Sequence, residues 1–250
     1  MAMFSGYVAY YLSQKVGLSF WFALLGALVF SLVLGLVIDR LISRPLMKAP
    51  ELSFVIGTLG LSIFLNSTAG VIFTKQPARF PSPFSPNPIN FYGLVIAREH
   101  LANIVIGVLF IIFLIVFFKF TNVGLAIRSV SQNKTVATLM GIDPNKIYSL
   151  TWIMSSCIGA FAGVFLGIIA YVEPSYMSGN LTKAFTAAVL GGLGSFPGAI
   201  FGGLILGVME NLSGAYISSG FKELMPMLVL LLILQFKPEG IFSIKTVKKL

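Results

Sequence analysis

The stretch AAVLGGLGSFPGAIFGGLILG, residues Ala187–Gly207, carries no charge and is apolar enough to lie in a lipid bilayer. Seven of its 21 residues are glycine, and Pro197 stands near its centre, where a helix would be interrupted. Irregular backbone at the depth of a bilayer is tolerated only where protein or a water-filled cavity surrounds it. We therefore expect a broken or re-entrant helix in the interior of a membrane protein, formed by residues Ala184–Gly192 and Gly198–Glu210.

The composition of the whole chain indicates the same class of protein. Of its 250 residues, 57% are hydrophobic and 10% are charged, and the mean hydropathy is +0.94. A soluble domain carries roughly a quarter charged residues, so this chain lacks the polar side chains that a water-facing surface needs. The formal net charge is +9, but the basic residues stand singly or in small groups, which argues against a nucleic-acid-binding face. The predicted fold is an all-α, polytopic transmembrane helical bundle, forming a single domain over residues 1–250.

Uncharged runs mark the expected membrane spans. The runs are Val16–Ile38, Leu52–Thr74, Leu101–Phe118, Ile147–Val172, Ala184–Met209 and a shorter Leu224–Phe236. The first five are long enough, or nearly so, to cross a bilayer as helices, which takes about 20 residues. The uncharged residues before Lys15 are too few for a crossing, so we expect part of a span or a half-helix packed inside the protein.

Basic residues between the runs predict the orientation, because cytoplasmic loops carry an excess of lysine and arginine. Asp39–Pro50, Lys119–Lys146 and the C-terminal tail should face the cytoplasm, and Lys75–His100 and Glu173–Lys183 should face outside. The remaining chain then makes an odd number of crossings. We favour the re-entrant element followed by one final inward span, and the number of full crossings between residues 184 and 236 stays open.

Glycines at intervals of four predict close helix packing. Residues four apart share a helix face, and glycine there lets two backbones approach each other. The glycines with this spacing are Gly159, Gly163, Gly167, Gly198, Gly202, Gly203 and Gly207.

The cytoplasmic segment TNVGLAIRSVSQNKTVATLMGIDPNK, residues 121–146, has the pattern of a structured elbow. Asn133 can cap a second short helix over Thr135–Met140, which Gly141 can end, and Asp143 can cap the next span. Loops of this length usually have a function. We expect the elbow to dock another protein at the cytoplasmic face; the alternative is a solvated surface connection.

Three stretches of this sequence resemble one family of transporters. GLAIRSVSQNKTVATLMGID is similar to the cytoplasmic coupling loop of permease subunits of branched-chain amino acid ABC importers. KAFTAAVLGGLGSFPGAIFGGLILGVMENLSGAYIS resembles the C-terminal signature of the LivH-type half of that family, and PEGIF resembles its closing motif. This sequence begins just before the stretch SGYVAYY, so it is shorter at its start than the family pattern.

The resemblance implies a function, partners and a location. The chain would be the permease subunit of an importer in the cytoplasmic (inner) membrane, with a cytoplasmic C-terminus. It would translocate branched-chain or related small amino acids with energy from partner ATPases. The partners would be a second homologous permease, two cytoplasmic ATPase subunits and an extracytoplasmic substrate-binding protein.

The resemblance also implies roles for particular residues. The elbow, residues 119–146, would couple to the ATPase through Gly124, Arg128, Gln132, Asn133, Ala137 and Gly141. The translocation pathway would be lined by Asn66, Gly191, Gly192, Gly194, Ser195, Pro197 and Gly198. The helix ends at the break could hold the charges of a zwitterionic substrate.

The chemistry of other protein classes is missing from the sequence. No Walker motif is present, so we expect no bound cofactor, with ATP bound by the partner subunits. We expect neither enzymatic activity nor a metal site, because His100 is the only histidine and Cys157 the only cysteine. Glu210 is either a half-buried functional group or the water-facing end of a helix. The alternative functions are a permease of the same family for amides or urea, and a neutral-solute channel.

Overall fold

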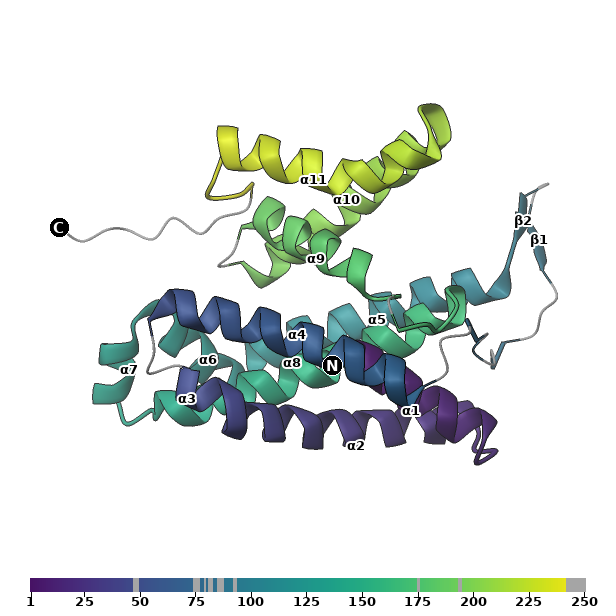
Figure 1. The fold of residues 1–250 in the computed structure, drawn as a ribbon. Helices are drawn as coiled ribbons and strands as arrows, with labels where there is room; N and C mark the ends of the chain where they lie inside the picture. The colour runs from purple at the N-terminus through teal and green to yellow at the C-terminus, as the bar shows by residue number, and fades with distance from the viewer. Residues whose placement is uncertain are drawn as a thin grey trace. The chain divides into compact units, whose positions relative to one another are not determined.

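The computed structural model describes residues 1–46, 50–73, 77–78, 80, 83–84, 88–91, 94–174, 176–192 and 195–241 (Figure 1). The chain divides into two compact units, Met1–Met177 and Ser178–Leu250. Each unit is described by itself. The single domain expected over residues 1–250 stays a prediction.

The first unit is built almost wholly from helices. Its helices are α1 (Ala2–Gln14), α2 (Phe20–Ile38), α3 (Arg44–Leu46), α4 (Glu51–Ile72), α5 (Arg98–Phe120), α6 (Asn122–Gln132), α7 (Lys134–Leu139) and α8 (Pro144–Ile169). A π-helical segment, Asp39–Ser43, joins α2 to α3 without a break. Strands β1 (Ile89–Phe91) and β2 (Leu94–Ile96) form a short antiparallel hairpin that stands beyond the start of α5 (Figure 1).

Helices α1, α2 and α8 pack together around the core of this unit. Phe4 and Tyr7 of α1 are buried, and the Tyr7 ring stacks on Phe73 with ring centroids 4.3 Å apart. Phe20 at the start of α2 lies edge-on to Phe165 of α8, at 5.9 Å. The residues before Lys15 thus form a helix that packs inside the unit.

Small residues let α2 and α8 lie close together. The hydroxyl of Ser31 donates to the carbonyl oxygen of Ser156 at 2.5 Å, and both side chains are buried. A Cβ on Gly35 would lie 2.6 Å from the Oγ of Ser156, so only glycine fits there. Gly163 likewise has no room for a side chain beside the backbone of Ala2, which confirms the predicted close packing at that position.

The second unit contains three helices, α9 (Ser178–Gly191), α10 (Phe196–Tyr216) and α11 (Ser219–Phe236). Each packs on the other two, and their shared core holds Ala187, Leu190, Leu206 and Val229. The interruption between α9 and α10 confirms the predicted broken helix.

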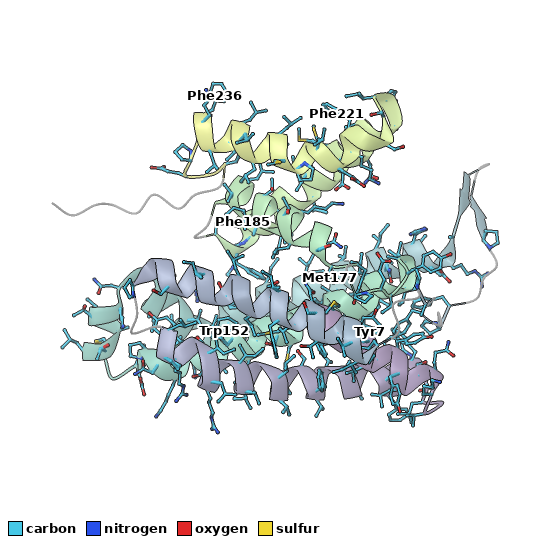
Figure 2. The ribbon with its side chains drawn as sticks, viewed as in Figure 1. Tyr7, Trp152, Met177, Phe185, Phe221 and Phe236 are labelled. Atoms are coloured by element: carbon cyan, nitrogen blue, oxygen red, sulfur yellow. The ribbon has the colours of Figure 1, made fainter. Side chains whose placement is uncertain are left out.

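The lengths and surfaces of the helices are those of a membrane protein. Among the described residues, five helices are long and apolar enough to cross a bilayer: Phe20–Leu46, Arg98–Phe120, Pro144–Ile169, Phe196–Tyr216 and Ser219–Phe236. Large apolar side chains stand on their outer surfaces, as Phe236 does at the end of α11 (Figure 2). The polytopic helical bundle predicted from the sequence is confirmed.

Two helix boundaries differ from the prediction for the same physical reason. The helix expected to end at Ile38 continues through Leu46, and the helix expected to end at Glu210 continues to Tyr216. The prediction places each helix end at a charged residue, but Asp39 and Glu210 are buried and neutralised by a basic partner. Asp39 pairs with Arg44, and Glu210 pairs with Lys183. The alternative of a water-facing helix end at Glu210 was therefore wrong.

Replacing Gly35 with leucine should lower the stability of the first unit by about 1–3 kcal/mol, because the new side chain overpacks the contact between α2 and α8. The measurement is the thermal unfolding midpoint of the detergent-solubilised protein. Gly60→Leu is the matched control, since no atom lies within 4 Å of a Cβ at Gly60. Equal midpoints for the two variants would contradict the close packing at Gly35.

Candidate functional site

The break between α9 and α10 is made by glycine, serine and proline, each in a position that suits it. Gly192 follows the end of α9 with φ of 99°, a left-handed conformation that glycine adopts without strain. Ser195 caps α10, and its Oγ accepts from the backbone N–H of Gly198 at 3.0 Å. Pro197 lies in the first turn of α10, where its missing N–H costs no helical hydrogen bond. Gly194 lies outside the described residues.

Three glycines bring the two arms of the broken helix, α9 and α10, into backbone contact. A Cβ on Gly191 would collide with the carbonyl group of Gly198, and a Cβ on Gly198 would collide with the carbonyl oxygen of Gly191. A Cβ on Gly202 would meet the carbonyl oxygen of Ala187. The predicted close packing is thus confirmed for Gly198 and Gly202.

The helix ends at the break have partners within the chain. The carbonyl oxygen of Leu190, in the last turn of α9, accepts from the N–H of Ile241 at 2.8 Å. In the first turn of α10 the N–H of Gly198 is bonded to Ser195, and Pro197 has none. These groups are therefore already bonded within the chain, which weakens the expectation that they hold the charges of a substrate.

The turn after α11 packs against the break. Gly240 adopts φ of 85°, and its N–H donates to the carbonyl oxygen of Lys237 at 2.9 Å. A Cβ on Gly240 would collide with the Cα of Gly192 and lie 2.7 Å from the carbonyl oxygen of Val189. In Figure 1 the chain turns back from the end of α11 toward α9. Gly240 and Ile241 of the closing motif therefore support the end of α9, a role that the sequence did not suggest.

A partly buried ion pair joins α9 and α10 at a second point. Lys183 Nζ of α9 lies 2.5 Å from Glu210 Oε1 of α10, and the Glu210 side chain is 10% exposed. Next to them, Thr186 of α9 is fully buried and donates to the carbonyl oxygen of Pro226 in α11, at 3.2 Å. Polar contacts thus hold the three helices together inside the unit.

The elbow has the capped helices that the sequence predicts. Asn133 Oδ1 accepts from the N–H of Val136 at 3.1 Å, and Asp143 Oδ1 accepts from the N–H of Asn145 at 3.0 Å. Gly141 follows α7 with φ of 83°, and the N–H of Ile142 donates to the carbonyl oxygen of Ala137 at 3.0 Å. This is the glycine-terminated helix end that the pattern indicates.

The residues expected to contact the ATPase fall into two groups. Gly124 and Ala137 are buried within the elbow. A Cβ on Gly124 would collide with the carbonyl group of Phe118, so Gly124 shapes the joint between α5 and α6. The other members of the set are exposed: Arg128, Gln132, Asn133 and Gly141.

The most exposed apolar side chains of the elbow lie at the end of α7, and none of them was among the predicted contact residues. Leu139 is 82% exposed and Met140 is 78% exposed at the end of α7, and Val136 is 52% exposed one turn earlier. The sequence does indicate that these side chains are exposed, because the capped segment from Asn133 to Gly141 is too short to bury its apolar side chains in a core of its own.

One residue of the predicted pathway, Asn66, belongs to α4 in the first unit. It is exposed there, so its part in the pathway stays a prediction.

In the described part of the chain, no group of three or more His, Cys, Asp or Glu side chains could hold a metal ion.

Comparisons with known proteins agree with this architecture. Residues 1–234 match the family described as "Branched-chain amino acid transport system / permease component". The chain is 34% identical to the high-affinity branched-chain amino acid transport system permease protein LivH of Salmonella typhimurium, over 90% of this chain and 75% of LivH. Identity to LivH of Escherichia coli K12 is also 34%, over 90% of this chain and 74% of LivH. Identity to BraD of Pseudomonas aeruginosa is 31%, over 91% of this chain and 76% of BraD. No solved structure gives a significant match.

The long apolar helices and their exposed apolar surfaces define a multi-pass membrane protein. The family match covers most of the chain, and the LivH relatives are similar along nearly the same length. The chain belongs to the permease family of branched-chain amino acid transport systems.

Replacing Gly240 with alanine should destabilise the second unit and reduce transport, because a Cβ there pushes the C-terminal turn away from Gly192. A left-handed backbone by itself costs an alanine about 1–2 kcal/mol. Gly17→Ala is the matched control, since Gly17 has φ of 75° and nothing within 4 Å of its Cβ position. If both variants lost the same amount of thermal midpoint and uptake, backbone strain alone would explain the losses, and the contact between Gly240 and Gly192 would not be needed.

Proposed function

We propose that this chain is the membrane-spanning permease subunit of an ATP-binding-cassette importer of branched-chain amino acids. It lies in the cytoplasmic membrane with its C-terminus inside, beside a second homologous permease. Two cytoplasmic ATPases bind and hydrolyse ATP, and an extracytoplasmic binding protein delivers the substrate.

The observation that carries this proposal is the similarity to LivH and BraD, whose names state high-affinity branched-chain amino acid transport. The exposed tip of α7 supports the ATPase contact. Leu139 and Met140 are exposed apolar residues at the end of a helix that Asn133 caps. Exposed apolar groups of this kind often mark protein contacts.

The elbow is joined to two long helices in a way that suits coupling. At the joint with α5, the Thr121 hydroxyl donates to the carbonyl oxygen of Phe117 at 2.7 Å and accepts from the N–H of Gly124 at 3.1 Å. Arg128 Nη2 donates to the carbonyl oxygen of Lys119 at 3.3 Å. At the other joint, α8 starts directly after the Asp143 cap. A movement imposed on the elbow by closing ATPases is thereby passed to α5 and α8.

Expression with a second permease, two ATPases and a binding protein should yield a complex that imports leucine, isoleucine or valine and consumes ATP. The measurement is co-purification of the subunits, followed by uptake of radiolabelled amino acid into proteoliposomes with and without ATP. Uptake that needs neither ATP nor partners would indicate a channel. ATP-driven uptake of amides or urea alone would show that these compounds, and not branched-chain amino acids, are the substrates.

The variant Leu139→Asp should weaken ATPase binding about tenfold or more, because a carboxylate replaces an apolar anchor at the contact. The amount of ATPase that co-purifies with the tagged permease measures this. Asn145→Ala is the control, since Asn145 is an exposed polar residue at the start of α8. Full ATPase recovery with Leu139→Asp would remove the tip of α7 from the docking surface.

A further inference from the structure

The C-terminal end of α2 contains a buried acid in a π-helical turn. Asp39 begins the π-helical segment that runs to Ser43, inside the continuous helix Phe20–Leu46. Single π-helical turns within α-helices are frequent at functional sites. The Asp39 side chain is 1% exposed, and a buried carboxylate needs a charged or hydrogen-bonding partner.

Arg44 supplies that partner and reaches a second helix as well. Its Nε lies 3.1 Å from Asp39 Oδ2, while its Nη2 donates to the hydroxyl of Ser149 at 2.9 Å. Ser149 belongs to α8. One guanidinium group therefore ties the π-helical segment to α8, and the Arg44 side chain remains 50% exposed.

The cluster has an acceptor that its present arrangement does not use. Asp39 Oδ1 and Ser43 Oγ are buried and have no hydrogen-bond partner among the residues that the structure describes. A guanidinium can bind both oxygens of a carboxylate through two parallel N–H donors. A bidentate pairing of Arg44 with Asp39 would use Oδ1 and release Ser149, which has a bond of its own to the carbonyl oxygen of Asn145 at 3.1 Å.

The exchangeable bond lies next to the elbow in the chain. Ser149 is in the second turn of α8, which begins at Pro144 immediately after the Asp143 cap, and both α6 and α7 contact α8. Further along the same two helices, Ser31 and Ser156 form a buried hydrogen bond. The Arg44–Ser149 bond therefore lies nearer to the elbow along α8 than the Ser31–Ser156 bond does.

We propose that Asp39, Arg44 and Ser149 are positioning residues that couple ATPase-driven movement of the elbow to α2. In one arrangement Arg44 bridges Asp39 and Ser149, and α2 follows α8. In the other Arg44 pairs with Asp39 alone, and the π-helical turn lets α2 move separately. Both arrangements keep the buried carboxylate neutralised, so the exchange leaves no unpaired charge. The inference rests on the proposed importer function.

The test uses the complete importer in proteoliposomes, with ATP hydrolysis and amino acid uptake measured in the same preparation. Ser149→Ala removes the hydroxyl acceptor on α8. Arg44→Lys keeps the positive charge but lacks the planar guanidinium group, which can bond Asp39 and Ser149 at the same time. Both should retain the assembled complex and raise the ATP hydrolysed per molecule imported about threefold or more. Arg40→Gln is the control, because Arg40 is an exposed residue of the same π-helical segment.

The outcomes separate coupling from simple structural support. An unchanged ratio of ATP to substrate in Ser149→Ala and Arg44→Lys would overturn the inference. So would equal losses of uptake, hydrolysis and recovered complex, since a merely structural role lowers all three together. If the wild-type assembly showed no ATP-dependent uptake, the importer function itself would fail, and the coupling role with it.

Discussion

Inside a bilayer, a polar group must find its partner within the protein, because hydrocarbon offers none. A charge buried in the protein interior needs a partner for the same reason, and both units supply one. Asp39 is paired with Arg44 in the first, and Glu210 is paired with Lys183 in the second. The same constraint acts on the backbone, where the carbonyl oxygen at the end of α9 accepts from Ile241. On the other side of the break, the N–H of Gly198 in the first turn of α10 donates to the hydroxyl of Ser195.

Close backbone contact follows from the same constraint. Where a helix is interrupted, its two arms can exclude lipid from the break only by touching, and side chains would keep them apart. Gly191, Gly198 and Gly202 remove that obstacle, and the turn at Gly240 covers the end of α9 from another side. A segment rich in leucine and valine would be equally apolar, but its side chains would hold the arms apart and open the break to its surroundings.

The sequence predicted the local features well and the long-range ones poorly. The caps at Asn133 and Asp143 and the turn at Gly141 depend on neighbours within a few residues, so they could be recognised from the sequence alone. The helix ends at Ile38 and Glu210 were wrong because a charge marks a boundary only when it faces water. Glu210 is neutralised by Lys183, which is 27 residues away, and Asp39 by Arg44, which a π-helical turn that was not predicted brings alongside it.

Glycines with the same spacing along a helix can have different neighbours, so a glycine pattern alone does not identify a packing contact. Gly198 and Gly202 are four residues apart on α10, and so are Gly203 and Gly207. The first pair touches α9 backbone, whereas a Cβ on Gly203 would make an ordinary 3.7 Å contact and one on Gly207 would meet open space. Spacing therefore specifies a helix face, and the neighbouring helix decides which face is used. The elbow follows the same logic, because Gly124 and Ala137 of the family-like motif shape the fold and the exposed Leu139 and Met140 remain for a partner.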